Sequence, residues 1–511
     1  MTAAAQELAE RLAQPSERWN PILVKEVRQA LRGRSFRWTF IATLTIAVLG
    51  VLTNLADFNH LREDAHGYFM TVHFCLVAAL VGMVPFGAFQ SMGSEWEEST
   101  ADLLVLSALR PRRIVAGKLQ GALVQAVLFF AAFSPFLVVA YLFPGIDLAA
   151  ALIYLGVILI ASLCASLAAL ALSTLSKQRF VRVVLMIVLG GQSAWLIPML
   201  MVLGDEVLRH PQQFTSDDEI LSVYATIGVA LLILAGYVFT LACNMLAHPE
   251  ENRSTNTRVL TTVSALLVAA YALLFTRWMS LPTEVISVMA LAGLAGLSAI
   301  GLLLVSEQRA LGRRVTLSVP KSPLGALATA PWFPGGGRGV AFHTLHVVLV
   351  LAVALSAIAW RRPSAPNFFA DGVGALIVAA LLSITYVTLL PGLLARLCEG
   401  SGARLAVRIA TPIAALLGLL VPAAIGAFVG DRDLARLEHL GNPGRLIERA
   451  WTQDGLPLRL MACVAGGALV ALLVNAPRLV RSTLETLAAA RVHRARDERA
   501  ALGDKAGQSR A

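Results

Sequence analysis

Long apolar runs constrain this chain more than any other feature of its sequence. They recur from about residue 38 to residue 477, each near the ~20 residues that a helix needs to cross a bilayer, with short polar connections between them. Only 14% of the residues are charged, against roughly 25% in soluble proteins. The sequence therefore predicts an all-α, polytopic integral membrane protein.

Twelve transmembrane helices are predicted, and the last of them is the shortest. They lie at about 38–56, 68–90, 119–143, 148–174, 183–204, 220–246, 259–276, 285–305, 340–360, 372–395, 409–430 and 460–477. If spans seven to twelve repeat spans one to six, the chain consists of two six-helix halves.

This pattern divides the chain into four expected parts. Residues 1–37 are a cytoplasmic N-terminus with an amphipathic interfacial (elbow) helix, and residues 38–246 are a first six-span unit. Residues 247–477 are a second, divergent six-span unit, and residues 478–511 are a basic cytoplasmic tail.

The distribution of Lys and Arg predicts the orientation, because cytoplasmic loops accumulate basic residues. With both termini on one side, that side holds 32 of the 42 basic residues and the other side holds 10. Both termini are therefore expected in the cytoplasm.

The stretch before the first span predicts a helix lying in the membrane interface. Asn20 and Pro21 supply a helix cap followed by a proline at the first helical position. An apolar stripe at four-residue spacing then runs among basic residues that suit anionic headgroups. The stripe is Leu23, Val27 and Leu31, and the basic residues include Lys25, Arg28 and Arg32.

The connection between spans two and three, residues 94–118, is the most structured of the loops. It begins with acidic residues, continues as a leucine-rich stripe and closes with basic residues, as suits a short surface helix and its dipole. Its polar members include Glu95, Glu97, Thr100, Asp102 and Lys118, and its stripe includes Leu104.

Together these two segments resemble the ABC-2 type transporter permeases. Members of that family have an elbow helix, then a cytoplasmic segment of the form E-x-E-x-G-T-x-[DE]-x-L-x-x-[ST]-x-[LI], then I-x-x-G-K before span three. The matching residues are Glu95, Glu97, Thr100, Asp102, Leu104, Ser107, Leu109, Ile114, Gly117 and Lys118. Trp96 and Ser99 depart from the pattern, where arginine and glycine are common.

The resemblance covers roughly residues 17–246 and implies a permease subunit of an exporter in a prokaryotic plasma (inner) membrane. It implies that residues 94–118 couple the spans to a separate ATP-binding subunit, engaged by Glu95, Glu97, Thr100 and Asp102. No phosphate-binding loop of the form G-x-x-x-x-G-K-[ST] is present in the sequence. We therefore expect no catalytic residue and no cofactor in this chain, with ATP and Mg²⁺ on the partner ATPase. No nucleic acid partner is expected.

The second half of the sequence leaves two arrangements open. The chain is either a fused pseudo-dimer, which the span count favours, or one permease unit with accessory spans that pairs with a second copy. The glycine-rich stretch Gly335–Gly339 is expected to be a flexible lead-in to span nine, with an anion-binding nest as the alternative.

Few ionisable residues lie within the predicted spans. His73, His343 and His346 are the main ones, and the i, i+3 pair of histidines on one helix face raised the possibility of a metal site. No third ligand is evident, so no metal is predicted. Gln192 and Ser193 in span five either line a pathway or bond neighbouring helices.

Two other functions remain alternatives at this point. One is an ion-coupled secondary transporter, although spans poor in acids offer little for a proton relay. The other is a membrane anchor that recruits an ATPase-containing assembly without transporting anything. Substrate identity does not follow from the sequence, because different exporters share similar apolar spans.

Overall fold

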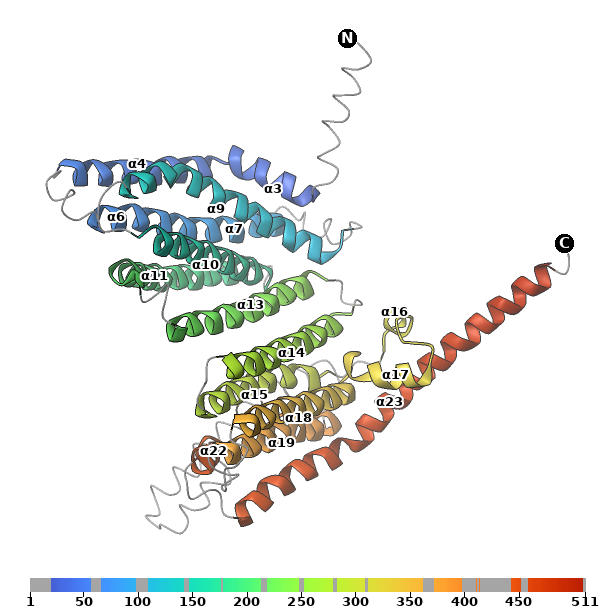
Figure 1. Ribbon diagram of the computed structural model, residues 1–511. Coiled ribbons are helices and arrows are strands. Elements are labelled where there is room, and N and C mark those ends of the chain that lie inside the picture. The colour runs from blue at the N-terminus through green and yellow to red at the C-terminus, as the bar shows by residue number, and fades with distance from the viewer. Residues whose placement is uncertain are drawn as a thin grey trace. The chain divides into compact units, whose positions relative to one another are not determined.

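The computed structural model is built from helices throughout the part of the chain that it describes (Figure 1). It describes residues 20–56, 66–97, 109–141, 147–175, 178–212, 218–247, 252–278, 283–307, 311–361, 372–397, 410, 413, 443–451 and 458–508. Every regular element in these ranges is helical, which confirms the all-α prediction.

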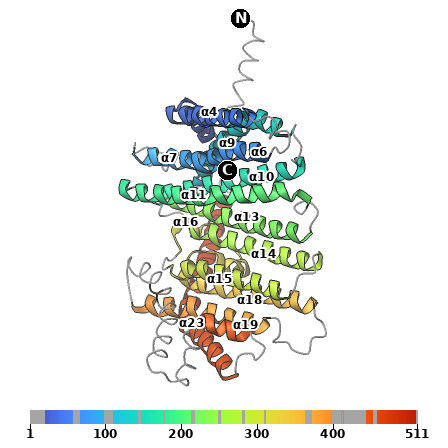
Figure 2. The same ribbon diagram turned by 90° about the vertical axis from the view of Figure 1, so that its left-hand side faces the viewer.

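The chain forms two compact units, Met1–Pro249 and Glu250–Ala511. The long helices of the first unit run roughly parallel to one another (Figure 2). Its elements are α3 (Pro21–Arg32), α4 (Arg34–Ala56), α6 (His66–Val77), η1 (Ala78–Met83), α7 (Val84–Glu97), α9 (Pro111–Tyr141), α10 (Leu148–Thr174), α11 (Arg179–Arg209) and α13 (Asp218–Leu246).

Eleven helical stretches in the described residues are long and apolar enough to cross a membrane. Six belong to the first unit and five to the second, and each corresponds to one of the predicted spans. The protein is therefore a multi-pass membrane protein. The remaining predicted span, 409–430, lies outside the described residues except at Ala410 and Ile413.

The second span contains a turn of π-helix, η1, between α6 and α7. Pro85 follows this turn and has no N–H to donate to the carbonyl of Val81, four residues earlier. Ser193 of α11 donates to that carbonyl at 3.1 Å, and Ser162 of α10 donates to the carbonyl of Leu80 at 2.6 Å. Two neighbouring helices thus satisfy the irregular backbone inside the membrane.

The second unit ends in an unusually long helix. Its elements are α14 (Ser254–Trp278), α15 (Thr283–Val305), α16 (Arg313–Thr316), α17 (Pro323–Thr329), η2 (Ala330–Trp332), α18 (Gly336–Arg361), α19 (Val373–Leu397), α22 (Pro443–Trp451) and α23 (Leu458–Gln508). At 1.5 Å per residue α23 is about 76 Å long, more than twice the hydrocarbon thickness. The last predicted span and the helical tail are therefore one continuous helix, which runs past α16 and α17 (Figure 1).

The described residues that flank the predicted span 409–430 lie at opposite ends of the second unit. Near the end of α19, the carbonyl of Pro391 accepts from Arg478 of α23 at 3.5 Å. Helix α22 follows the predicted span, and its Trp451 lies against Gly372 at the opposite end of α19, its start. Figure 1 likewise places α22 at one end of this unit and α17 at the other.

The expectation of a flexible glycine lead-in to span nine is wrong, because Gly336–Gly339 form the first turn of α18. A Cβ on Gly337 would lie 2.7 Å from Ser482 Oγ of α23, and a Cβ on Gly339 would lie 2.7 Å from the carbonyl carbon of Leu304 in α15. These glycines let α18 approach the backbones of two neighbours.

Two buried arginines link neighbouring segments near the start of α18. Arg258 of α14 donates to Glu307 Oε2 at 3.0 Å and to the carbonyl of Pro331 at 2.6 Å. Arg338 of α18 donates to the carbonyl of Ser482 in α23 at 2.9 Å. Because the guanidinium group is planar with five donors, one side chain can make several such contacts. Arg258 links α14 to η2 and to Glu307 beyond α15, whereas Arg338 links α18 to α23.

We predict that Gly339→Ala destabilises the purified protein, whereas Gly293→Ala does not. A Cβ at residue 339 overlaps the α15 backbone and should cost ~1–3 kcal/mol, while a Cβ at residue 293 meets nothing within 4 Å. Thermal unfolding in detergent measures both. A melting point for Gly339→Ala at or above that of the unmodified protein would contradict the close packing of α15 and α18.

Candidate functional site

Helix α3 is held against the start of α9 by its N-cap residue. Asn20 Oδ1 accepts from the Ile22 amide at 3.1 Å, and Asn20 Nδ2 donates to the carbonyl of Arg113 at 2.6 Å. The predicted cap, with proline at the first helical position, is confirmed. One side chain therefore begins α3 and fixes it to the first turn of α9.

Two glycines of α9 make room for α3. A Cβ on Gly117 would lie 2.7 Å from the Cβ of Ile22, and a Cβ on Gly121 would lie 3.0 Å from the Cβ of Glu26. Small residues at four-residue spacing allow two helices to approach closely in a membrane. Lys118 lies between these glycines, at the contact.

Lys118 is the centre of a buried polar cluster formed by Lys25, Glu26, Ser91, Glu95 and Lys118, which we name the Lys118 cluster. Lys118 Nζ lies 2.6 Å from Glu26 Oε1 and 3.0 Å from Glu95 Oε1, and it donates to the carbonyl of Ser91 at 3.1 Å. Lys25 Nζ also lies 3.0 Å from Glu95 Oε1. The cluster joins α3, α7 and α9.

The charges of the Lys118 cluster cancel, since it holds two lysines and two glutamates. The side chain of Lys118 is 2% exposed, that of Glu95 is 5% exposed and that of Glu26 is 9% exposed. Buried charges of this kind are tolerated when each is paired, and removing one partner leaves another charge in a poorly solvated place. Removing one partner is therefore expected to cost more free energy than the intact pairs contribute to stability.

A second ion pair ties the end of α7 to α11. Arg182 donates to the carbonyl of Gly93 at 2.5 Å and to Glu97 Oε1 at 2.9 Å. The C-terminus of a helix carries partial negative charge, which favours nearby cations. The last turns of α7 are thus held by cations from α3, α9 and α11.

Trp96, which departs from the family pattern, packs against a small apolar cluster beside the Lys118 cluster. That apolar cluster includes Ile114 of α9, Leu167 of α10 and Leu246 of α13. An arginine in this place would have to bring its charge against these apolar side chains. The tryptophan instead extends the contacts of α7 to two further helices.

The structure brings together three of the residues selected from the sequence, namely Lys25, Glu95 and Lys118. Glu97 is separate from them and pairs with Arg182, and its side chain is 62% exposed. The other selected residues fall into two groups. Arg28 and Arg32 are exposed on α3, and Thr100, Asp102 and Leu104 lie outside the described residues.

One detail of the sequence interpretation is wrong. The ends of segment 94–118 are not part of a separate surface helix, because Ser94–Glu97 continue α7 and Pro111–Lys118 begin α9. The buried face of α3 is Ile22, Leu23 and Glu26, while Leu31 is 45% exposed. Pairing with Lys118 accounts for the glutamate on this buried face.

Sequence reasoning missed Glu26 and Arg182. Glu26 belongs to the apolar face of α3, since it lies three and four residues after Leu23 and Ile22. An acid on an otherwise apolar helical face is a signal that a buried cation lies opposite. Arg182 lies one residue before the predicted start of span five, where a basic residue is ordinary.

The intramembrane histidines do not form a metal site in the described part of the chain. His343 Nε2 lies 3.1 Å from Ser383 Oγ of α19, whereas His346 Nε2 lies 3.0 Å from Thr262 Oγ1 of α14. Their side chains thus serve different helix contacts. The described residues contain no group of three or more metal-ligating side chains.

Comparison of the chain with protein-family models, with curated proteins and with solved structures finds no match in any of the three sets.

We predict that Lys118→Met lowers the free energy of unfolding by about 3–5 kcal/mol, because it leaves two buried carboxylates without their main partner. Lys25→Met should cost about 1 kcal/mol or less, since its side chain is 41% exposed. Denaturation of the detergent-purified protein measures both. Adding Glu26→Gln to Lys118→Met should recover part of the loss, and equal costs for the two lysines would contradict a Lys118-centred cluster.

Proposed function

We propose that this chain is the membrane-spanning permease subunit of an ATP-driven exporter of the ABC-2 type. The observation that carries the proposal is that ion pairs hold the described residues on both sides of residues 98–108. Before this segment, the end of α7 is held by the Lys118 cluster and Arg182, and after it α9 contributes Lys118 itself. The resemblance of residues 94–118 to the family's coupling segment agrees with this arrangement.

The polar contacts provide a route by which a partner bound to residues 98–108 would move several helices together. Glu97 links the end of α7 to α11 through Arg182. Glu95 links the same end of α7 to α9 through Lys118, which also pairs with Glu26 of α3. A paired, buried cluster has few alternative arrangements, so a displacement of α7 carries its neighbours with it as a rigid body. Alternating access or outward gating would follow.

The partner in this proposal is a separate ATP-binding subunit, which binds ATP and Mg²⁺ and hydrolyses the ATP. The Lys118 cluster and both termini face the cytoplasm of a prokaryotic cell, as the distribution of basic residues predicts. The described six-span bundle of the first unit acts as one permease half. The second unit, or the first unit of a second copy, supplies the other half.

We predict that affinity purification from the native cell in mild detergent retains a P-loop ATPase. Asp102→Ala should weaken this retention about tenfold, equivalent to ~1.4 kcal/mol of docking energy, while leaving the Arg182 pair in place. Glu97→Ala should do the same and also free Arg182. Mass spectrometry of the co-purifying chains and their ATP hydrolysis measure the effect.

Glu206→Ala is the matched control, because Glu206 is an exposed acid in the last turns of α11, at the other end of the helix from Arg182. It should retain the ATPase fully. Absence of any ATPase in several detergents would refute the permease proposal, and uptake that follows an ion gradient without ATP would favour a secondary carrier. ATPase retention without a translocated substrate would favour a membrane anchor.

A further inference from the structure

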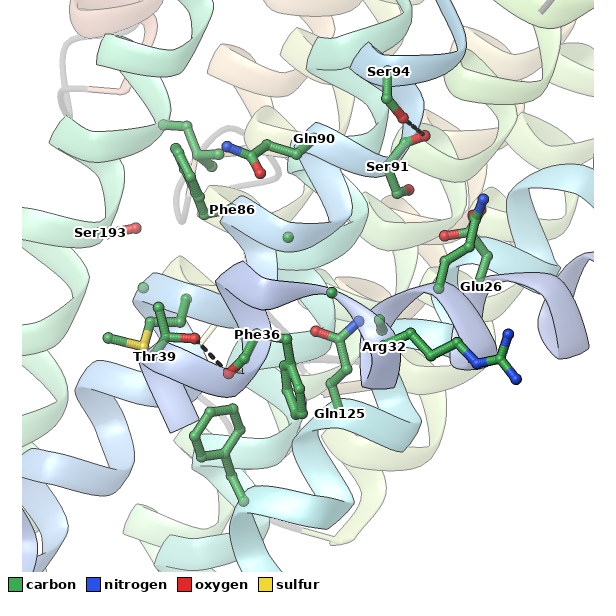
Figure 3. A pocket seen from close by; sticks show the side chains of 18 of the residues that line it. Glu26, Arg32, Phe36, Thr39, Phe86, Gln90, Ser91, Ser94, Gln125 and Ser193 are labelled. Atoms are coloured by element: carbon green, nitrogen blue, oxygen red, sulfur yellow. Dashed lines mark hydrogen bonds between the residues drawn. The ribbon is translucent and has the colours of Figure 1, made fainter. Parts of the chain in front are cut away.

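A cavity of about 800 Å³ lies in the first unit between the α3–α4 corner and helices α7, α9 and α11. This volume is within the ~300–1,000 Å³ range of small-molecule sites. Figure 3 shows Glu26 and Arg32 on one side of the cavity, and Phe86, Thr39 and Ser193 on the other. The cavity therefore has a charged end and a largely uncharged end.

The charged end is positive. Arg28 and Arg32 line the cavity and are exposed, and the described residues provide neither with an ion-pair partner. Glu26 also lines the cavity, but Lys118 Nζ lies 2.6 Å from its carboxylate and offsets its charge. Two arginines thus remain for an anionic group, and guanidinium groups bind phosphate and carboxylate oxygens in pairs.

The other end extends into the membrane-spanning part of the bundle. The wall formed by η1 and α7 runs from Ser94 to Gly82, which is about 18 Å at 1.5 Å per residue. Aromatic side chains cover much of this length, including Phe36 of α4 and Phe129 of α9. Residues 82–90 of this wall lie within the predicted second span, so a ligand there places apolar groups about 12 Å into a ~30 Å hydrocarbon layer.

Two amides lie between the charged end and the deepest part of the cavity. Gln90 of α7 and Gln125 of α9 both line it, and Figure 3 shows their side chains on different walls. Amides supply donors and acceptors without a net charge. They suit the uncharged polar groups, such as hydroxyls, esters or amides, that join a headgroup to its chains.

We propose that this cavity binds a membrane amphiphile whose headgroup carries a phosphate or carboxylate. The headgroup lies at Arg28 and Arg32, the linking polar groups lie at Gln90 and Gln125, and a chain lies along the aromatic wall. Basic pockets between membrane helices are suited to such headgroups. As the entry site for cargo, the cavity rests on the proposed export function, but its binding does not require the ATPase.

A shared residue pair connects the cavity to the Lys118 cluster. Glu26 and Ser91 line the cavity and also contact Lys118 Nζ, at 2.6 Å and 3.1 Å. Occupancy of the charged end therefore acts on the same side chains that hold α3 and α7 to α9. In the proposed transporter, this contact lets bound cargo influence the coupling segment.

Native mass spectrometry of the full-length chain tests the proposal, with phosphatidylglycerol and phosphatidylcholine of identical acyl chains as probes. We expect the unmodified protein to bind one phosphatidylglycerol at least tenfold more tightly than phosphatidylcholine. Arg28→Gln with Arg32→Gln should reduce that preference to threefold or less. Glycerol 3-phosphate at equal concentration should not displace the lipid, because the free headgroup lacks the apolar contacts.

Two matched controls separate this cavity from the general lipid surface. Arg110→Gln with Arg113→Gln removes two exposed charges beside the start of α9, outside the cavity, and should leave the preference unchanged. Gly190→Phe should abolish tight binding, whereas Gly191→Phe should not. A Cβ at either glycine meets nothing within 4 Å, but only Gly190 lines the cavity.

Three results would overturn the proposal. They are equal binding of the two lipids by the unmodified protein, equal losses in the two double arginine variants, and displacement by glycerol 3-phosphate, which would indicate a site for a free anion. Each readout is independent of ATPase co-purification. Lipid binding without an ATPase would therefore refute the transport function alone, and an ATPase without lipid preference would refute the cavity assignment alone.

Discussion

The contact of Lys118 with Glu26 and Glu95 is the interaction on which the arrangement of the first unit depends. Lysine and glutamate side chains are rarely buried unless they are paired, and here each pairing crosses from one helix to another. The glycines on either side of Lys118 bring α3 close enough for the contact to form. Helix α3 is thereby fixed to two spans.

Both units gather buried charge at helix ends, although they use different residues. The first unit relies on Lys118, which pairs with two carboxylates, and on Arg182. The second relies on Arg258 and Arg338, each of which binds carbonyl groups and one carboxylate. Helix ends expose carbonyl groups that lack intrahelical partners, so a buried guanidinium group can satisfy several at once. Such contacts stiffen a bundle at one end while its apolar middle holds together through packing.

The eleven spans in the described residues were predictable because a membrane helix needs only length and apolar composition. The cap at Asn20 was predictable because its residue pattern is local. The pairing of Glu26 was missed, because its place on the apolar face of α3 signals a buried cation opposite but does not identify that cation as Lys118. The order within Gly336–Gly339 was missed because close approach of α15 and α23 turns a flexible composition into a helical turn. The continuity of the last span with the tail in α23 was not predicted, because backbone hydrogen bonding continues after the apolar run stops.

The most direct test of this account is the position of α3 relative to the bundle with and without Lys118. Spin labels at Leu31 of α3 and Leu175 after α10, both exposed positions, give a distance distribution in detergent or nanodiscs. The account predicts one narrow distribution in the otherwise unmodified protein and a broad one once Lys118→Met is added. The same narrow distribution in both proteins would show that apolar packing alone holds α3, and that the Lys118 cluster does not link it to the spans.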